Sequence, residues 1–185
     1  AAAAQGEWAD CGYIDGPARQ DEFYWHVLPA FVGFAKTTVV IVSDALRYEV
    51  ARDVAALLER ERGGNVKVSS MQAVFPSITE VGMPALLPHQ VLELAEDGAF
   101  VLADDMPTAT TPQREAVLAH VEPTARALRS SAYLNMAGTE RKAMLKDSRL
   151  VYLYHNKIDA TGEKAATQDD VFDASTVSVQ AVSYT

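Results

Sequence analysis

The sequence holds a single cysteine, Cys11, among 185 residues. One cysteine excludes a disulfide framework within the chain and a cysteine-rich zinc module, and it favours a reducing compartment. No apolar run approaches the ~20 residues needed to span a bilayer, and no basic segment followed by an apolar stretch opens the chain. We therefore expect a cytoplasmic protein that has no membrane partner.

Positive charge is also scarce, because 16 lysines and arginines stand against 25 aspartates and glutamates. The net charge of −9 argues against a protein that grips a polyanion with its whole surface. It leaves room for a local basic patch, or for an acidic site that holds cations. With 49% apolar and 22% charged residues the composition is that of a globular protein, and the length predicts one domain.

The apolar pattern predicts three strands. The continuous β-branched run at 38–43 is typical of a central parallel strand covered on both faces. Helical spacing follows over 45–62, and a second strand is expected at 66–74, so that these segments would form one right-handed βαβ unit. The third strand is expected at 150–154.

Further helices are predicted at 22–35, 111–122, 123–132 and 138–147. Gln20 or Asp21 would cap the first, and Thr111 would cap the second with Pro112 at its first position. Alternating strands and helices predict an α/β domain with a mainly parallel sheet sandwiched by helices.

Polar residues follow each predicted strand. Asp44 comes after the first, Ser77 and Thr79 after the second, and His155 and Asp159 after the third. Because ligands bind beyond the carboxyl ends of strands in open α/β sheets, we expect these groups to share one cleft. Carboxylates and an imidazole suit a hard or borderline divalent metal, and a hydroxyl near a helix N-terminus suits a phosphate.

Each of these residues also has a purely structural interpretation. Asp44 could cap the helix at 45–62, and Thr79 could cap a helix near Pro84. His155 could be a hydrogen-bonded structural histidine, and Asp159 could be a turn residue. Their convergence on one sheet edge is what favours a functional site.

Three blocks of sequence surround these positions: Val42-Ser-Asp-Ala-Leu-Arg-Tyr-Glu-Val50, Phe75-Pro-Ser-Ile-Thr-Glu-Val-Gly-Met83 and Tyr154-His-Asn-Lys-Ile-Asp-Ala-Thr-Gly-Glu163. They resemble the blocks of PglZ domains, a branch of the alkaline phosphatase superfamily that belongs to the BREX phage-defence system. The resemblance covers about residues 20–173. It implies an alkaline-phosphatase-like catalytic domain over 21–185, preceded by an irregular segment at 1–20.

The resemblance implies a site in which two divalent metals flank a Ser or Thr nucleophile that attacks phosphorus. The metals are usually zinc, with manganese or magnesium as alternatives. Asp44 resembles the metal-ligating aspartate after the first strand. The block that begins at Phe75 is similar to the Phe-Pro-Ser/Thr-x-Thr of nucleotide pyrophosphatase/phosphodiesterases, which selects Thr79 rather than Ser77 as nucleophile. Asp159-x-x-Gly-Glu163 resembles their Asp-x-x-Gly-His, so both carboxylates are expected ligands.

Four further positions carry weaker expectations. His155 is expected either to ligate a metal or to orient Asp159. Gly82 stands where the relatives have an asparagine that contacts phosphate, so that contact is missing or replaced. Ser77 and Arg47 are candidates for substrate contacts, although Arg47 could instead pair with neighbouring carboxylates.

The relatives' Asp-His-Gly block and their final histidine ligand do not occur in the sequence, so we expect an incomplete domain with part of the metal site missing. The main hypothesis is a metal-dependent phosphodiesterase or nuclease that acts on a phosphate ester or nucleic acid, with other BREX proteins as partners. The alternatives are an inactive scaffold or interaction module of the defence complex, and a phosphomonoesterase. Homo-oligomerisation is left open.

One segment of this acidic chain carries a net positive charge. Residues 123–149 hold six basic and two acidic residues, a net +4. They predict either a solvated helical face or a groove for a nucleic-acid backbone. The second block ends in Leu86-Leu-Pro-His89, and the resemblance implies that His89 belongs to the family's structural loop.

Overall fold

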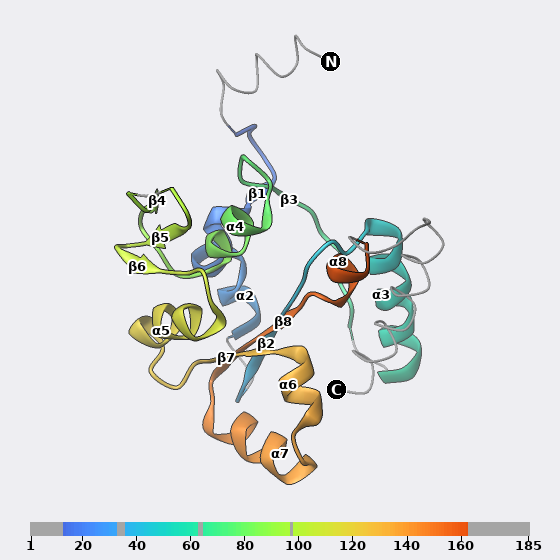
Figure 1. The fold of residues 1–185 in the computed structure, drawn as a ribbon. Helices are drawn as coiled ribbons and strands as arrows, with labels where there is room; N and C mark the ends of the chain where they lie inside the picture. Colours follow the sequence, from blue (N-terminus) through green and yellow to red (C-terminus); the bar gives the residue numbers. More distant parts are fainter. Residues whose placement is uncertain (1–12, 33–35, 63–64, 97, 163–185) are drawn as a thin grey trace. The chain divides into compact units, whose positions relative to one another are not determined.

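The computed structural model describes residues 13–32, 36–62, 65–96 and 98–162. Contacts divide the chain into two compact units. Unit 1 comprises the described residues up to 32 together with 70–121, and unit 2 comprises the described residues of 36–69 and 122–162. The chain therefore passes from one unit to the other three times, and its course can be followed by colour in Figure 1.

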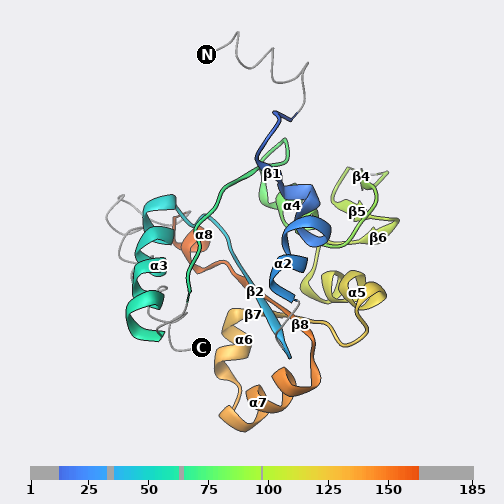
Figure 2. The same ribbon diagram turned by 180° about the vertical axis from the view of Figure 1, so that it is seen from behind.

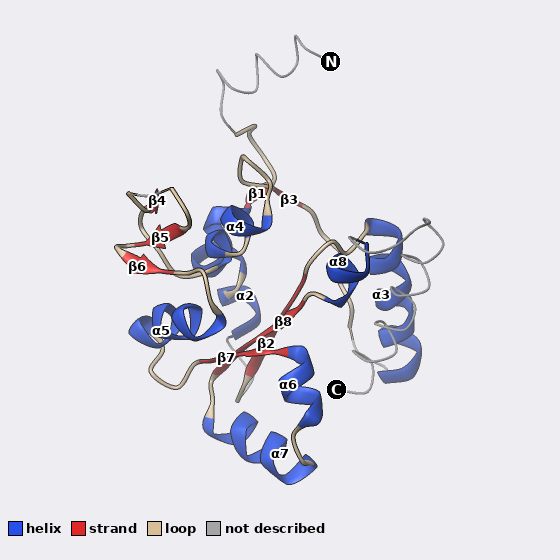
Figure 3. Ribbon diagram, in the orientation of Figure 1, coloured by secondary structure: helices blue, strands red, loops and turns tan. Residues whose placement is uncertain are grey.

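Unit 2 is built on a parallel sheet of three strands in the order β2-β8-β7 (Figure 3). The strands are β2 (Thr38–Ser43), β7 (Arg126–Arg129) and β8 (Leu150–His155). The middle strand is β8, and each of its six residues is buried. It extends the strand predicted at 150–154 by one residue, because His155 also pairs with β2.

The predicted central position of the β-branched strand is wrong. Among the described strands β2 lies at an edge of its sheet, and Val39 and Ile41 are 42% and 41% exposed. A β-branched run identifies a strand because such side chains fit the pleated backbone. Its place within the sheet depends instead on which distant segments pair with it.

A helical crossover joins β7 to β8 and covers one face of this sheet. Its helices are α6 (Ser130–Asn135) and α7 (Gly138–Asp147), of which α7 has its predicted bounds. Tyr133 of α6 packs with Val151 and Leu153 of β8. The partly buried residues around this core are Leu128, Met136, Met144 and Leu145. The helix predicted at 123–132 is wrong over 126–129, because those residues pair with β8 as a strand.

Two helices leave the sheet at the carboxyl ends of β2 and β8. They are α3 (Tyr48–Arg62) and α8 (Lys157–Gly162), and both views show them side by side (Figures 1 and 2). The start predicted for α3 at residue 45 is wrong by three residues. Ala45 has a φ of 57°, in the left-handed region, so the chain turns there before the helix begins.

Unit 1 contains a parallel pair of short strands, β1 (Ala18–Arg19) and β3 (Met71–Gln72). The strand predicted at 66–74 is therefore much shorter than expected. It pairs with β1 and not with β2, so the predicted βαβ unit is wrong. Strand pairing is a long-range choice, and the helical spacing between two strands does not reveal it.

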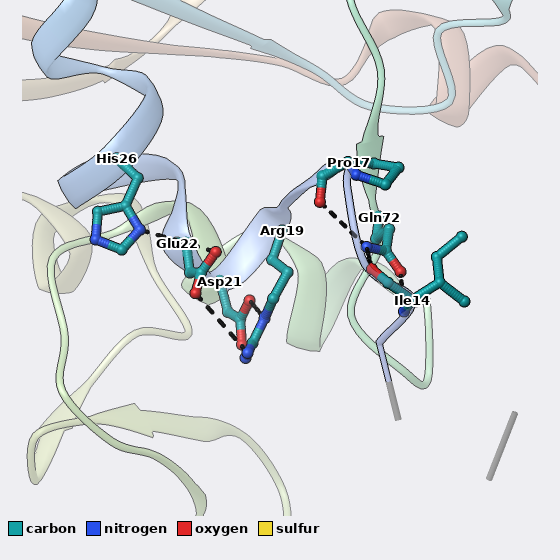
Figure 4. A network of polar contacts seen from close by, with 7 residues as sticks. All are labelled: Ile14, Pro17, Arg19, Asp21, Glu22, His26 and Gln72. Atoms are coloured by element: carbon teal, nitrogen blue, oxygen red, sulfur yellow. Dashed lines mark hydrogen bonds and ion pairs between the residues drawn. The ribbon is translucent and has the colours of Figure 1, made fainter. Parts of the chain in front are cut away.

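Side chains explain this pairing (Figure 4). The buried Gln72 amide accepts a hydrogen bond from the N–H of Ile14 at 2.8 Å and donates to the carbonyls of Ile14 at 2.7 Å and Pro17 at 3.1 Å. Beside it, Arg19 forms an ion pair with Asp21 and lies 3.8 Å from Glu22. The Gln72 side chain thus connects β3 to the start of the described chain. Its hydrogen bonds satisfy backbone groups of Ile14 and Pro17 that would otherwise bond water.

The helix predicted over 22–35 is three short segments in its described part: the 3-10 helix η1 (Gln20–Glu22), the π-helix η2 (Phe23–Val27) and α2 (Pro29–Val32). Pro29 interrupts a regular helix because it has no N–H to donate. The two predicted caps are wrong. Asp21 pairs with Arg19, and Gln20 accepts from the N–H of Val74 at 3.1 Å and donates to the carbonyl of Gly82 at 2.9 Å.

The rest of unit 1 consists of α4 (Thr79–Gly82), the 3-10 helix η3 (Pro84–Leu86), the antiparallel strands β4 (Leu92–Leu94), β5 (Val101–Ala103) and β6 (Met106–Pro107), and α5 (Thr111–Val121). Asp104 and Asp105 form the two-residue turn between β5 and β6, both with positive φ, as a right-twisted hairpin requires. The helix predicted at 111–122 is confirmed. Its cap is Thr110 and not Thr111, since the N–H of Gln113 donates to the Thr110 hydroxyl.

Candidate active site

The carboxyl ends of β2 and β8 meet at one edge of the unit 2 sheet. The two strands are parallel and in register, with Ser43 opposite His155. Asp44 follows directly, and its N–H donates to the carbonyl of His155 at 2.9 Å. Sheet pairing therefore brings the first and third sequence blocks together, as their positions after the strands predicted.

Asp44 is a half-buried carboxylate that does not cap α3, so this alternative is wrong. The helix begins at Tyr48, and the Asp44 carboxylate accepts from the N–H of Ala45 at 3.1 Å. A capping side chain would instead bond the second or third N–H of the helix. The backbone turn at Ala45 separates the carboxylate from the helix and keeps it at the strand end.

Asp159 lies in the first turn of α8 and is half-buried. The alternative of a turn residue is therefore wrong, because the predicted turn continues as helix to Gly162. A carboxylate at this position is favoured by the positive end of the helix dipole. Glu163, the other expected ligand of this block, lies outside the described residues.

His155 ends β8 and is only 6% exposed. Its Nδ1 lies 3.0 Å from the hydroxyl oxygen of Ser43 on the neighbouring strand. Burial lowers the pKa of the imidazole below 6.5, and the positive charge of Lys157 lowers it further. The ring is therefore neutral at pH 7. The sequence did not single out Ser43, because its pairing with His155 depends on the register of two strands that are far apart in the chain.

This lowered pKa makes stability depend on pH. Below about pH 6.5 the exposed ring of the unfolded chain binds protons that the folded ring does not, so the free energy of unfolding should fall as the pH drops. Above that pH the contribution is complete. Urea denaturation between about pH 5 and 8 should show the fall in the native sequence and a smaller one in His155→Gln. The exposed His120→Gln should behave like the native sequence, and an equal fall in all three would contradict the assignment.

Thr79, Ser77 and Gly82 belong to unit 1, whereas Asp44, His155 and Asp159 belong to unit 2. The meeting of the hydroxyl with the carboxylates thus stays a prediction. Thr79 is the half-buried first residue of α4, and Ser77 in the preceding loop is exposed. The alternative that Thr79 caps a helix near Pro84 is wrong, because Met83 stands at the cap position of η3.

The Gln20 side chain packs closely against the backbone of Gly82. A Cβ there would lie 3.2 Å from Nε2 of Gln20, the nitrogen that donates to the Gly82 carbonyl. The Gln20 amide therefore fills the space in which an asparagine side chain would begin. The phosphate contact expected at this position in the relatives has no side chain to supply it here.

Comparison with known proteins decides the family. Residues 23–183 match the model of the BREX system PglZ alkaline phosphatase-like domain. The chain belongs to this family. Two curated relatives agree: "Alkaline phosphatase-like protein BrxZ" of Escherichia coli is 37% identical over 164 residues, and "Alkaline phosphatase-like protein PglZ" of Bacillus cereus is 34% identical over 172. No solved structure matches the chain at a significant level.

These alignments cover 87% and 93% of the chain, but only 19% and 20% of the relatives. The PglZ domain chain thus spans about a fifth of the length of the curated relatives it matches. Its fold agrees with the expected class, since parallel sheets are flanked by helices. None of the helices in the described ranges is both long enough and apolar enough to cross a bilayer.

The described residues of the PglZ domain supply the right donor atoms for a divalent metal but too few of them. Asp44 and Asp159 carry carboxylate oxygens, which zinc, manganese and magnesium accept. Across the described ranges, however, no group of three or more His, Cys, Asp and Glu side chains is placed to hold a metal ion. The residues fit a metal site chemically, and its remaining ligands would have to come from other residues, Glu163 among them.

His89 has the structural role that we expected. It is 8% exposed, its Nδ1 lies 2.7 Å from the carbonyl oxygen of Leu87, and its own carbonyl accepts from the indole of Trp25 at 3.0 Å. Because a carbonyl only accepts, the His89 ring carries its hydrogen on Nδ1. Arg47 is exposed just before α3, and its carbonyl accepts from the N–H of Ala51.

The basic segment at 123–149 is not one helical face. Arg126 and Arg129 lie on β7 and are three positions apart, so they point to opposite faces of the sheet. Arg149 lies 3.9 Å from Glu122, and Arg141 stacks 5.7 Å from the ring centre of Tyr133. Arg126 and Arg129 therefore do not line one face together, which does not favour a single groove for a nucleic-acid backbone that uses all six basic residues.

Proposed function

We propose that this PglZ domain carries part of the active site of a metal-dependent phosphodiesterase or nuclease of a phage-defence system. Thr79 is the nucleophile, and Asp44 and Asp159 are metal ligands, with Glu163 as a further ligand. The observation that carries the proposal is the register of β2 and β8, which brings Asp44 and the helix of Asp159 to one sheet edge in a domain of this family. The substrate is a phosphate ester, and other BREX proteins are the partners.

The reaction assigns one task to each side chain. The Thr79 oxygen forms a bond to phosphorus and releases its proton, while the bond from phosphorus to the leaving alcohol breaks and that oxygen takes up a proton. Water then cleaves the phosphothreonine ester. Asp44 and Asp159 would hold divalent metals at this edge of the sheet. When bound, such metals would lower the pKa of the attacking hydroxyl and neutralise charge on the phosphoryl oxygens.

Metal dependence gives the first test. In the full-length protein that carries this sequence, a chelator should abolish hydrolysis of bis-p-nitrophenyl phosphate, and zinc or manganese should restore it. Asp44→Asn and Asp159→Asn should each lower kcat/KM by about a hundredfold or more, because loss of residues that only support ligands already costs about 10- to 100-fold. Asp53→Asn, an exposed residue of α3, is the control and should change little. Chelator-resistant hydrolysis would contradict the proposal.

A second candidate is an inactive scaffold within the defence complex. A scaffold predicts that Asp44→Asn and Asp159→Asn leave both complex assembly and phage resistance unchanged. Loss of resistance with intact assembly would reject it. A phosphomonoesterase would instead prefer p-nitrophenyl phosphate to the diester.

A further inference from the structure

The strongest further feature is the cross-strand pair of Ser43 and His155. Ser43 is half-buried and His155 is 94% shielded from solvent, and the two oppose each other at the last register position of β2 and β8. The Ser43 oxygen lies 3.0 Å from Nδ1 of His155, which is a normal hydrogen-bond length. Ser43 lies directly before Asp44 in the chain, and His155 lies four residues before Asp159.

The direction of this bond follows from what each atom can do. A serine hydroxyl has one hydrogen to donate. Toward the described residues, the Ser43 side chain makes no hydrogen bond other than the one to His155. If Nδ1 carried the hydrogen, the serine hydrogen would have no acceptor among the described residues. The arrangement that satisfies both groups has the Ser43 O–H donating to Nδ1.

A neutral imidazole whose Nδ1 accepts carries its hydrogen on Nε2. Within the part of the chain that the structure describes, Nε2 has no hydrogen-bond partner. A protonated nitrogen has no lone pair for a metal, but it can donate to an oxygen. The oxygen that the proposed reaction brings to this edge is a phosphoryl oxygen of the substrate.

We propose that Ser43 is a positioning residue that holds His155 in the Nε2–H tautomer, so that His155 donates a hydrogen bond to a phosphoryl oxygen and does not bind the metal. The substrate contact rests on the proposed function, whereas the tautomer does not. This assignment replaces the two roles that the sequence left open for His155, metal ligation and orientation of Asp159, with a contact to the substrate.

Nitrogen-15 NMR of the 185-residue chain, labelled at histidine, tests the tautomer directly at about pH 8, where the His155 ring is neutral because its pKa is lowered. His89 is an internal reference, because its contact with the Leu87 carbonyl requires hydrogen on Nδ1. His155 should show the opposite pattern, with its hydrogen on Nε2. A His155 spectrum like that of His89 would overturn the proposal.

Variants of Ser43 and the addition of zinc extend the NMR experiment. Ser43→Thr keeps a hydroxyl and should keep the Nε2–H tautomer, whereas Ser43→Ala should allow both tautomers. Addition of zinc alone should leave the Nε2–H signal of His155 in place. Loss of that hydrogen on zinc binding would show that His155 is a ligand, and the proposal would be wrong.

Kinetics of the full-length protein on bis-p-nitrophenyl phosphate test the positioning role. Ser43→Ala and His155→Gln should each lower kcat/KM by about 10- to 100-fold, the range for a hydrogen bond to a charged group. The double variant should be no worse than His155→Gln, because Ser43 acts through His155. Ser43→Thr should keep most activity. Additive losses would reject the positioning role. The NMR result is independent of hydrolysis, so failure of the proposed reaction and failure of the tautomer are distinguishable.

Discussion

Thr79→Ala should lower the rate of phosphodiester hydrolysis by at least about a thousandfold in the full-length protein. Removal of the nucleophilic oxygen removes the covalent step itself, and what remains is binding and electrostatic stabilisation. Steady-state kinetics with bis-p-nitrophenyl phosphate measure the change. Thr79→Ser keeps a hydroxyl at the same position and should retain a measurable part of the activity, which an alanine cannot.

Ser77→Ala provides the matched control for this result. Ser77 is a hydroxyl residue two positions earlier, in the loop that precedes α4, and it is exposed. Its substitution should lower the rate by less than about tenfold, because the resemblance selects the second hydroxyl of the block as nucleophile. Full activity in Thr79→Ala, or an equal loss in Ser77→Ala, would contradict the assignment. Mass spectrometry of the protein after a rapid quench should locate the phosphoryl group on Thr79.

Leu153→Ala should reduce the free energy of unfolding by about 2–5 kcal/mol, the range for deletion of a buried leucine side chain. Leu153 is 3% exposed in the middle strand of unit 2, where it packs with Tyr133 and Val151. Its loss leaves a cavity at a position of β8 two residues before His155. Urea denaturation followed by circular dichroism measures the change, and the same variant should weaken hydrolysis by the full-length protein.

Ile41→Ala is the control, because Ile41 is the register partner of Leu153 on β2 and is 41% exposed. The two substitutions remove similar side chains from adjacent positions of one sheet, so that burial is the main difference between them. Ile41→Ala should cost about 1 kcal/mol or less, since surface substitutions rarely cost more. Equal losses would show that β2 is covered on that face in solution.

Local signals in the sequence predicted several elements of the fold. The strand β2 and the helices α5 and α7 follow from apolar spacing and capping residues, which act between neighbours in the chain. The order of the three blocks predicted the family, and it also placed Asp44 and Asp159 after strands. These features depend on residue type and short-range spacing alone.

Non-local contacts explain what the sequence did not predict. The helix expected at 123–132 is partly a strand because Leu128 pairs opposite Leu153, and no local signal at 126–129 reveals that partner. The same holds for Gln72, whose three hydrogen bonds reach residues 55 and 58 positions earlier and draw β3 to β1. Propensity is weak next to such contacts, which form only once the chain has folded.

The sequence by itself determined that carboxylates, a hydroxyl and an imidazole stand after strands in a PglZ-type order, because motif spacing is a property of the covalent chain. Only the tertiary structure decided that β8 is the middle strand and that Ser43 faces His155. Strand register joins positions 112 residues apart, and nothing in the local sequence encodes which residue lies opposite which. A single cysteine and a scarcity of positive charge excluded whole classes of protein, but the partner of one imidazole required the fold.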